Sequence, residues 1–165
     1  MRLLAEAAAE TTASPEAIWA VWTDPSLRPA WHPRLKWATL DGPLAVGTEG
    51  RWKPDRARPV SVRVAEVVPG RRLVFDGIHG LPVARGHYEY ELSPAPGGEG
   101  TRLVHRVRLS GPLAAPIARF FGRPLGVSAT PEAVAAVLAL ADDGLAPAVD
   151  SPGRPARRST GGPAL

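Results

Sequence analysis

Hydrophobic and polar residues alternate with a period of two between Thr101 and Ser110. The apolar phase consists of Leu103, His105, Val107 and Leu109, and the opposite phase includes Arg102, Arg106 and Arg108. Such alternation is typical of a strand in an antiparallel sheet with one face on the core and the other in water. Because one register sets the facing of a whole strand, we expect the apolar phase to be buried, His105 included, and the arginines to be exposed.

Six further segments have the composition of strands and are separated by turn residues. They are residues 2–12, 36–40, 47–52, 60–68, 73–78 and 87–92. Pro69-Gly70 and the Pro/Gly-rich stretch 93–100 predict short connections between neighbouring strands. The alternation in 60–68 slips at Glu66, which indicates a β-bulge, and its phase places Arg63 on the outer face. With the opposite phase, Arg63 would instead be a residue that binds a ligand carboxylate or ketone.

Helical signals lie at both ends of the chain. Ser14 can cap a first helix that has Pro15 at its first position and stops at Asp24-Pro25, and a second short helix follows it. Near the other end, residues 134–141 carry apolar side chains at helical spacing after Thr130-Pro131. An amphipathic piece covers 113–121, and the glycines and prolines from Gly122 to Pro131 predict a break or kink between the two pieces.

The order of these elements, together with several short motifs, resembles the SRPBCC (START-like) superfamily, and within it the bacterial polyketide cyclase/dehydrase and lipid-transport-like proteins. The motifs are ASPEAIW at 13–19, TDP at 23–25, Trp31 with Pro33, LDGPL at 40–44, VGT at 46–48, VVPGRRLVF at 67–75, GTRL at 100–103 and SGPL at 110–113. The resemblance implies an α+β helix-grip fold over residues 1–145, a curved antiparallel sheet of about seven strands wrapped around a C-terminal helix. It also implies a cavity between sheet and helix that takes lipids, sterols, polyketides or other hydrophobic molecules.

Composition excludes several kinds of site. The 165 residues include no cysteine, which excludes disulfides, thiolate catalysis and cysteine-ligated metals. The four histidines have no metal-binding spacing, so we expect neither a metal site nor a cofactor. No apolar run reaches membrane-spanning length, and Glu6 and Glu10 make the N-terminus a poor signal peptide. We therefore expect a cytoplasmic protein without membrane insertion.

The net charge of +4 does not indicate nucleic-acid binding. Arg154, Arg157 and Arg158 against Asp150 place +2 of it in the final stretch, which leaves about +2 on the rest of the chain. A nucleic-acid interface would gather basic residues and aromatics on one element. The expected partner is therefore a small hydrophobic molecule rather than a nucleic acid.

His105 is the main candidate for chemistry. A desolvated imidazole has a lowered pKa and stays neutral near pH 7, where it can exchange a proton. Tyr90, on a neighbouring predicted strand, is the second candidate catalytic residue. The simpler alternative is a buried histidine satisfied by a backbone carbonyl, by Tyr88 or by Tyr90.

Aromatic residues supply a candidate ligand-binding surface. All five tryptophans lie within the first 52 residues. The candidate surface consists of Trp31, Trp37, Trp52, Phe75, Tyr88 and Tyr90, together with His105. The alternative is that these side chains only fill the core. Trp19 and Trp22 are expected to pack, and His32, His79 and His87 are expected at the surface.

Three functions remain open. The first is binding, or transport, of a small hydrophobic or amphipathic molecule in an internal cavity. The second is a polyketide aromatase/cyclase or dehydratase, in which the cavity folds a poly-β-ketone while His105 and a tyrosine move protons. The third is a protein-interaction domain with a filled interior.

Residues 146–165 are rich in Pro, Gly and Arg without apolar periodicity, which predicts a disordered tail. This segment lacks the apolar surface needed to offset the entropy of ordering it. Truncation after Gly144 should therefore lower the melting temperature by less than about 5 °C. A larger loss in a thermal melt would show that the tail docks on the domain.

Overall fold

The computed structural model describes residues 1–78, 84–125 and 128–144. Seven strands form one antiparallel sheet in the order β1-β7-β6-β5-β4-β3-β2. They are β1 (Arg2–Thr11), β2 (Leu35–Leu40), β3 (Glu49–Pro54), β4 (Val60–Val68), β5 (Arg72–Ile78), β6 (Arg85–Pro94) and β7 (Thr101–Ser110). Since β2 to β7 are neighbours in chain order and β1 pairs with β7, the predicted N-terminal strand and six-strand meander are confirmed.

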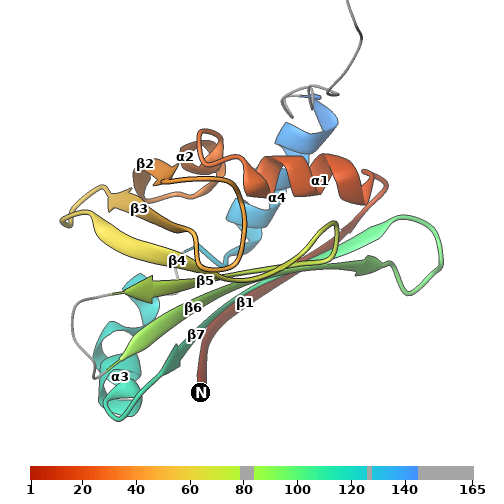
Figure 1. Cartoon of the computed structure of the whole chain (residues 1–165). Helices are drawn as coiled ribbons and strands as arrows, with labels where there is room; N and C mark the ends of the chain where they lie inside the picture. The colour runs from red at the N-terminus through yellow and green to blue at the C-terminus, as the bar shows by residue number, and fades with distance from the viewer. Residues whose placement is uncertain (79–83, 126–127, 145–165) are drawn as a thin grey trace, which may run out of the picture.

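Helices cover the concave side of this sheet. The described residues contain α1 (Pro15–Thr23), α2 (Arg28–Trp31), α3 (Ala114–Leu125) and α4 (Pro131–Asp142). Figure 1 shows α1, α2 and α4 over one face of the curved sheet, and α4 packs against α1, α2 and β1. In contrast, α3 lies apart from them and contacts β1 and β7. The helix-grip α+β fold is confirmed. The predicted break separates α3 from α4, but it begins later than expected, since Gly122 and Pro124 lie within α3.

Capping residues set where two of the helices begin. The Ser14 hydroxyl accepts a hydrogen bond from the backbone N–H of Ala17 at 3.2 Å, with proline in the first turn of α1. The Thr130 hydroxyl does the same for Ala133 at 3.2 Å, again with proline in the first turn of α4. Both caps satisfy a backbone donor that the helix itself leaves unpaired. The helix starts expected from these motifs are therefore confirmed.

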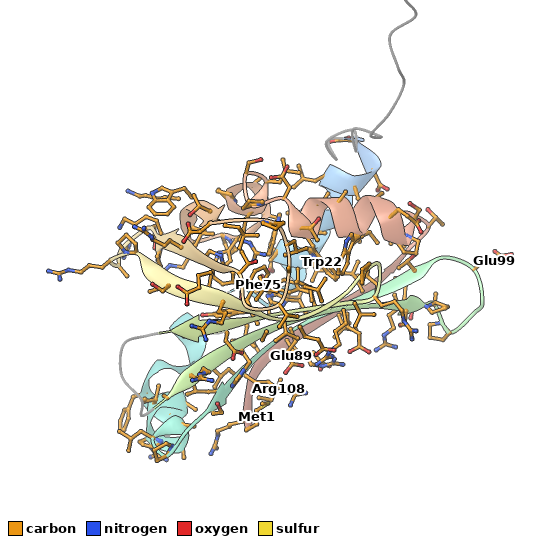
Figure 2. The ribbon with its side chains drawn as sticks, in the orientation of Figure 1. Met1, Trp22, Phe75, Glu89, Glu99 and Arg108 are labelled. Atoms are coloured by element: carbon orange, nitrogen blue, oxygen red, sulfur yellow. The ribbon has the colours of Figure 1, made fainter. Side chains whose placement is uncertain are left out.

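The facing of β7 agrees with its alternation. Leu103, His105, Val107 and Leu109 are all buried, and Arg102 is exposed. Arg106 and Arg108 also lie on the outer face, but they are only half-exposed, which differs from the expectation. The reason is pairing across strands. The Arg106 guanidinium lies 2.8 Å from Glu91, and that of Arg108 lies 3.0 Å from Glu89. Figure 2 shows Glu89 and Arg108 on the face of the sheet away from α1.

The predicted bulge in β4 is also present. The pairing of β4 with β5 shifts register between Val64 and Glu66. Arg63 is exposed and its guanidinium forms an ion pair with Glu49 at 2.5 Å. Arg63 therefore faces outward, as its phase indicated. The predicted tail of residues 146–165 and His79 lie outside the described residues.

One glycine sets the approach of β1 to β7. Gly100 has φ +89°, and a Cβ there would lie 2.3 Å from the carbonyl oxygen of Thr11. Gly100→Ala should lower the free energy of unfolding by about 2 kcal/mol or more, because strain and overlap add. Gly70 is the matched control, since it has φ +68° and no atom within 4 Å of its Cβ position. Gly70→Ala should cost only about 1 kcal/mol, and equal losses in urea denaturation would contradict this account.

Candidate ligand-binding site

Most of the predicted aromatic surface gathers on the inner face of the sheet. We call the buried side chains that meet there the aromatic cluster. Its members are Trp22, Trp31, Trp52, Phe75, Tyr88, Tyr90 and His105. Neighbouring rings lie 4.2 to 6.4 Å apart between centroids. Figure 2 shows Trp22 and Phe75 in the layer between α1 and the sheet.

Strand pairing explains why these residues meet. Tyr90 is directly opposite His105 on β7, and Tyr88 is directly opposite Phe75 on β5. Since Tyr88 and Tyr90 are two residues apart, their side chains lie on the same face. The strand part of the cluster is thus assembled by the register between adjacent strands, and Trp22 and Trp31 join it from α1 and α2.

Trp37 is not brought into this group. The pairing of β2 with β3 shifts register between Leu35 and Trp37. As a result Leu35 and Ala38 are buried, whereas Lys36 and Trp37 are both exposed, Trp37 by 40%. The irregularity turns the indole outward, which the sequence pattern does not reveal. Six of the seven predicted ligand-binding residues therefore lie together, without Trp37.

Sequence reasoning missed the central side chain of the cluster. Arg28, on α2, is only 2% exposed, and its guanidinium carbon lies 4.5 to 5.3 Å from the ring centroids of four aromatic residues. Those rings belong to Trp31, Trp52, Phe75 and Tyr90. One Nη donates to the Tyr90 hydroxyl at 2.7 Å and the other to the Trp22 carbonyl at 3.4 Å. An arginine three residues before a tryptophan, in a segment rich in indoles, was the available signal.

His105 is held by two hydrogen bonds. Its Nδ1 lies 2.9 Å from the Glu89 carbonyl oxygen and its Nε2 lies 3.1 Å from the Ser128 hydroxyl. Since a carbonyl only accepts, Nδ1 carries the proton and Nε2 accepts from Ser128. Burial, with a smaller effect from the charge of Arg28, lowers the pKa of His105 to about 3. The imidazole is therefore neutral at pH 7, in the arrangement expected of a histidine satisfied by a backbone carbonyl.

Tyr90 contacts His105 through its ring rather than its hydroxyl. The two rings are stacked, with centroids 4.2 Å apart and planes inclined by 7°. The Tyr90 hydroxyl accepts from Arg28 instead. Burial raises the pKa of Tyr90, so the phenol stays protonated. The two predicted catalytic residues are thus neighbours without a hydrogen bond between them, and Ser128 is the partner that sequence reasoning missed.

Two histidines predicted at the surface are not there. His32 is buried, and burial together with the charge of Arg28 lowers its pKa to about 4. It follows α2 directly, so it is drawn inside with Arg28. His87 is half-buried on the outer face, where its ring nitrogens lie 2.7 Å from Asp76 and 2.6 Å from Ser110. The helix before it thus decides the position of His32, and side chains of the adjacent strands decide that of His87.

Other kinds of site find no support in the described part of the chain. It contains no group of three or more histidines and acids that could hold a metal ion. No described helix is both long enough and apolar enough to cross a membrane.

An open groove of about 690 Å³ runs between α1, where Trp19 lines it, and the Pro69-Gly70 turn. The aromatic cluster does not line this groove.

The two buried imidazoles predict that acid destabilises the fold. The unfolded chain binds a proton at each imidazole below the ordinary pKa of 6.5, whereas the folded chain excludes it until about pH 4 at His32 and about pH 3 at His105. Stability should thus fall as pH drops from about 6.5 toward 4, by about 1.4 kcal/mol per pH unit for each histidine. When the free energy of unfolding is measured by urea denaturation at several pH values, it should fall less steeply with decreasing pH in His105→Gln and in His32→Gln than in the parent. Unchanged slopes in both variants would contradict the lowered pKa values.

Solved structures share this fold at low sequence identity. A protein from Nitrosomonas europaea is 18% identical with a TM-score of 0.60, over 84% of this chain and 93% of that one. A protein from Mesorhizobium loti is 21% identical with a TM-score of 0.58, over 84% and 97% of the two chains. DynU16, from the dynemicin biosynthetic locus, is 18% identical with a TM-score of 0.57, over 85% of this chain and 47% of its own. These likenesses show the fold alone.

Family membership comes from the sequence itself. A comparison with curated proteins finds no match. The family model described as "Polyketide cyclase / dehydrase and lipid transport" matches residues 3–146, which include all but the first residue of β1, the other described strands and helices, and the whole aromatic cluster. The chain therefore belongs to the polyketide cyclase/dehydrase and lipid-transport family.

Proposed function

We propose that this protein binds a small hydrophobic or amphipathic molecule between the inner face of the sheet and α1, α2 and α4. The observation that carries the proposal is the aromatic cluster, in which rings from two helices and four strands converge on one place. Aromatic rings offer a large apolar surface with few rotatable bonds, which suits a planar or elongated apolar ligand. The family description, which names lipid transport, supports the same class of ligand.

A cyclase or dehydratase is the second candidate, and the hydrogen bond between His105 and Ser128 favours it. In this alternative Nε2 of His105 would exchange a proton with the bound poly-β-ketone. However, an imidazole with a pKa of about 3 is a weak base at pH 7. Protonating it there costs about 5 kcal/mol. We therefore favour ligand binding over catalysis as the function of this protein.

The interaction-domain alternative also has an observation in its favour. The rings of the aromatic cluster contact one another directly, for example Trp52 with Tyr88 at 4.9 Å. A ligand would have to replace some of these contacts. The choice between a filled core and a ligand-binding interior is thus open to direct experiment.

Intrinsic tryptophan fluorescence tests the proposal, because Trp22, Trp31 and Trp52 belong to the cluster. Titration with fatty acids, sterols, flavonoids and aromatic polyketides should shift or quench the emission for at least one class. Trp52→Ala should weaken that binding by about 1–3 kcal/mol, the value of one large apolar contact. Trp37→Ala is the matched control and should leave affinity unchanged, since Trp37 is exposed and outside the cluster.

His105→Phe separates binding from catalysis. If the protein is a binder, His105→Phe should roughly preserve affinity, because most ligand contacts are apolar. If it is a cyclase, the same variant should still bind but lose turnover by about a hundredfold or more. Absence of binding across the whole panel would reject the proposal in favour of a filled interior. The binding data for Trp52→Ala and His105→Phe are interpreted only if each variant has a near-ultraviolet circular dichroism spectrum like that of the parent.

A further inference from the structure

We propose that Arg28 receives the carboxylate of an amphipathic ligand, so that the molecule bound by the aromatic cluster is an organic monoanion with an apolar body. This inference rests on the proposed function and narrows its ligand class. Three observations carry it: a buried positive charge without a counter-charge among the described residues, hydrogen-bond donors in excess of acceptors, and a surrounding aromatic cluster without an acidic side chain.

The charge of Arg28 has no acidic partner in the part of the chain that the structure describes. Its side chain is 2% exposed, and the described ion pairs of the sheet involve other arginines. Burying a cation is costly unless an anion or strong acceptors compensate it. The four surrounding rings offset part of this cost through their π faces. A carboxylate would supply the rest.

The donors around Arg28 outnumber the acceptors. A guanidinium has five N–H groups, and only two hydrogen bonds, to Tyr90 and Trp22, are present among the described residues. Because the Tyr90 hydroxyl accepts from Arg28, its own proton remains to be donated. The indole N–H of Trp31 is buried and has no hydrogen-bond partner within residues 1–78, 84–125 and 128–144. The remaining guanidinium N–H groups, the Tyr90 hydroxyl and the Trp31 indole therefore lack an acceptor in the described part of the chain. One ligand oxygen group placed beside the guanidinium could accept from them.

The kind of acceptor follows from the charge balance. His32 and His105 are neutral at pH 7, so Arg28 supplies the single positive charge at the aromatic cluster. One cation matches a monoanion, whereas a phosphate dianion would leave negative charge uncompensated in an apolar interior. A neutral alcohol or ketone would satisfy donors without balancing the charge. A carboxylate does both, and a planar guanidinium pairs with it through two parallel hydrogen bonds.

Decanoate and decanol test this inference, because they differ only in the head group. At pH 7.5, calorimetric or fluorescence titration of the parent protein should give at least about tenfold tighter binding of decanoate, which corresponds to about 1.4 kcal/mol. Arg28→Met should remove this preference, so that the variant binds decanoate and decanol with affinities within about twofold of each other. Arg63→Met is the matched control, since Arg63 is exposed and paired with Glu49, and it should keep the preference.

A second measurement needs no change at Arg28. In a ¹⁵N–¹H correlation spectrum of the parent protein, the indole N–H signal of Trp31 should move downfield with decanoate and much less with decanol. Trp31→Phe identifies that signal. This readout reports the formation of a hydrogen bond directly, even if Arg28→Met fails to fold.

The outcomes separate this inference from the proposed function. Equal affinity for decanoate and decanol in the parent would overturn the role of Arg28 while leaving an apolar binding site. A carboxylate preference that survives in folded Arg28→Met would overturn it as well. Binding of neither compound, nor of any member of the wider panel, would overturn both proposals.

Discussion

The interior of this protein depends on one buried positive charge. The guanidinium of Arg28 is held by the hydroxyl of Tyr90, the carbonyl of Trp22 and four aromatic faces. A hydrogen bond to a charged group contributes about 1.5–3 kcal/mol and a desolvated cation–π contact about 2 kcal/mol, which together offset a large desolvation cost only if every partner keeps its place. The rings therefore cannot be regarded as filling alone, because they also solvate a charge. This double role explains why α2, with only four residues, is fixed in position against the sheet.

The same charge determines what chemistry the interior can perform. Burial is the main reason that the pKa values of His32 and His105 are low, and the charge of Arg28 lowers both further. An imidazole whose pKa lies this far below 7 stays neutral, accepts a hydrogen bond at its unprotonated nitrogen, and takes up a proton at pH 7 only at a large free-energy cost. The hydroxyl of Ser128, which donates to His105, connects the segment before α4 to β7. The electrostatics therefore support the proposed binding function over acid–base catalysis, whereas the hydrogen bond between His105 and Ser128 is the contact that an acid–base role would use.

The sequence predicts the fold well because the fold depends on local patterns. Alternation in β7, turn residues between strands and the Ser14 and Thr130 caps specify the elements one by one, and the motifs specify their family. The site is less predictable because it depends on contacts between distant segments. The hydrogen bond from Arg28 to Tyr90 spans 62 residues, and neither residue signals the other in sequence. The position of Trp37 is hard to predict for a related reason. One register shift in β2 turns its side chain to the face opposite to the one that strict alternation along the strand would give.

The outer face of the sheet constrains the inner site through register. Arg106 pairs with Glu6 on β1 and with Glu91 on β6, and Arg108 pairs with Glu89 on β6. Each partly exposed pair contributes little to stability by itself. These ion pairs instead favour one register, because they join β7 to the strands on either side of it. A slip of one residue would bury Arg106 and expose His105, and would separate Tyr90 from the ring that it stacks on. The charged outer face and the aromatic inner face therefore both follow from the register of β7 with its neighbouring strands. A change that shifts this register alters the side chains on both faces.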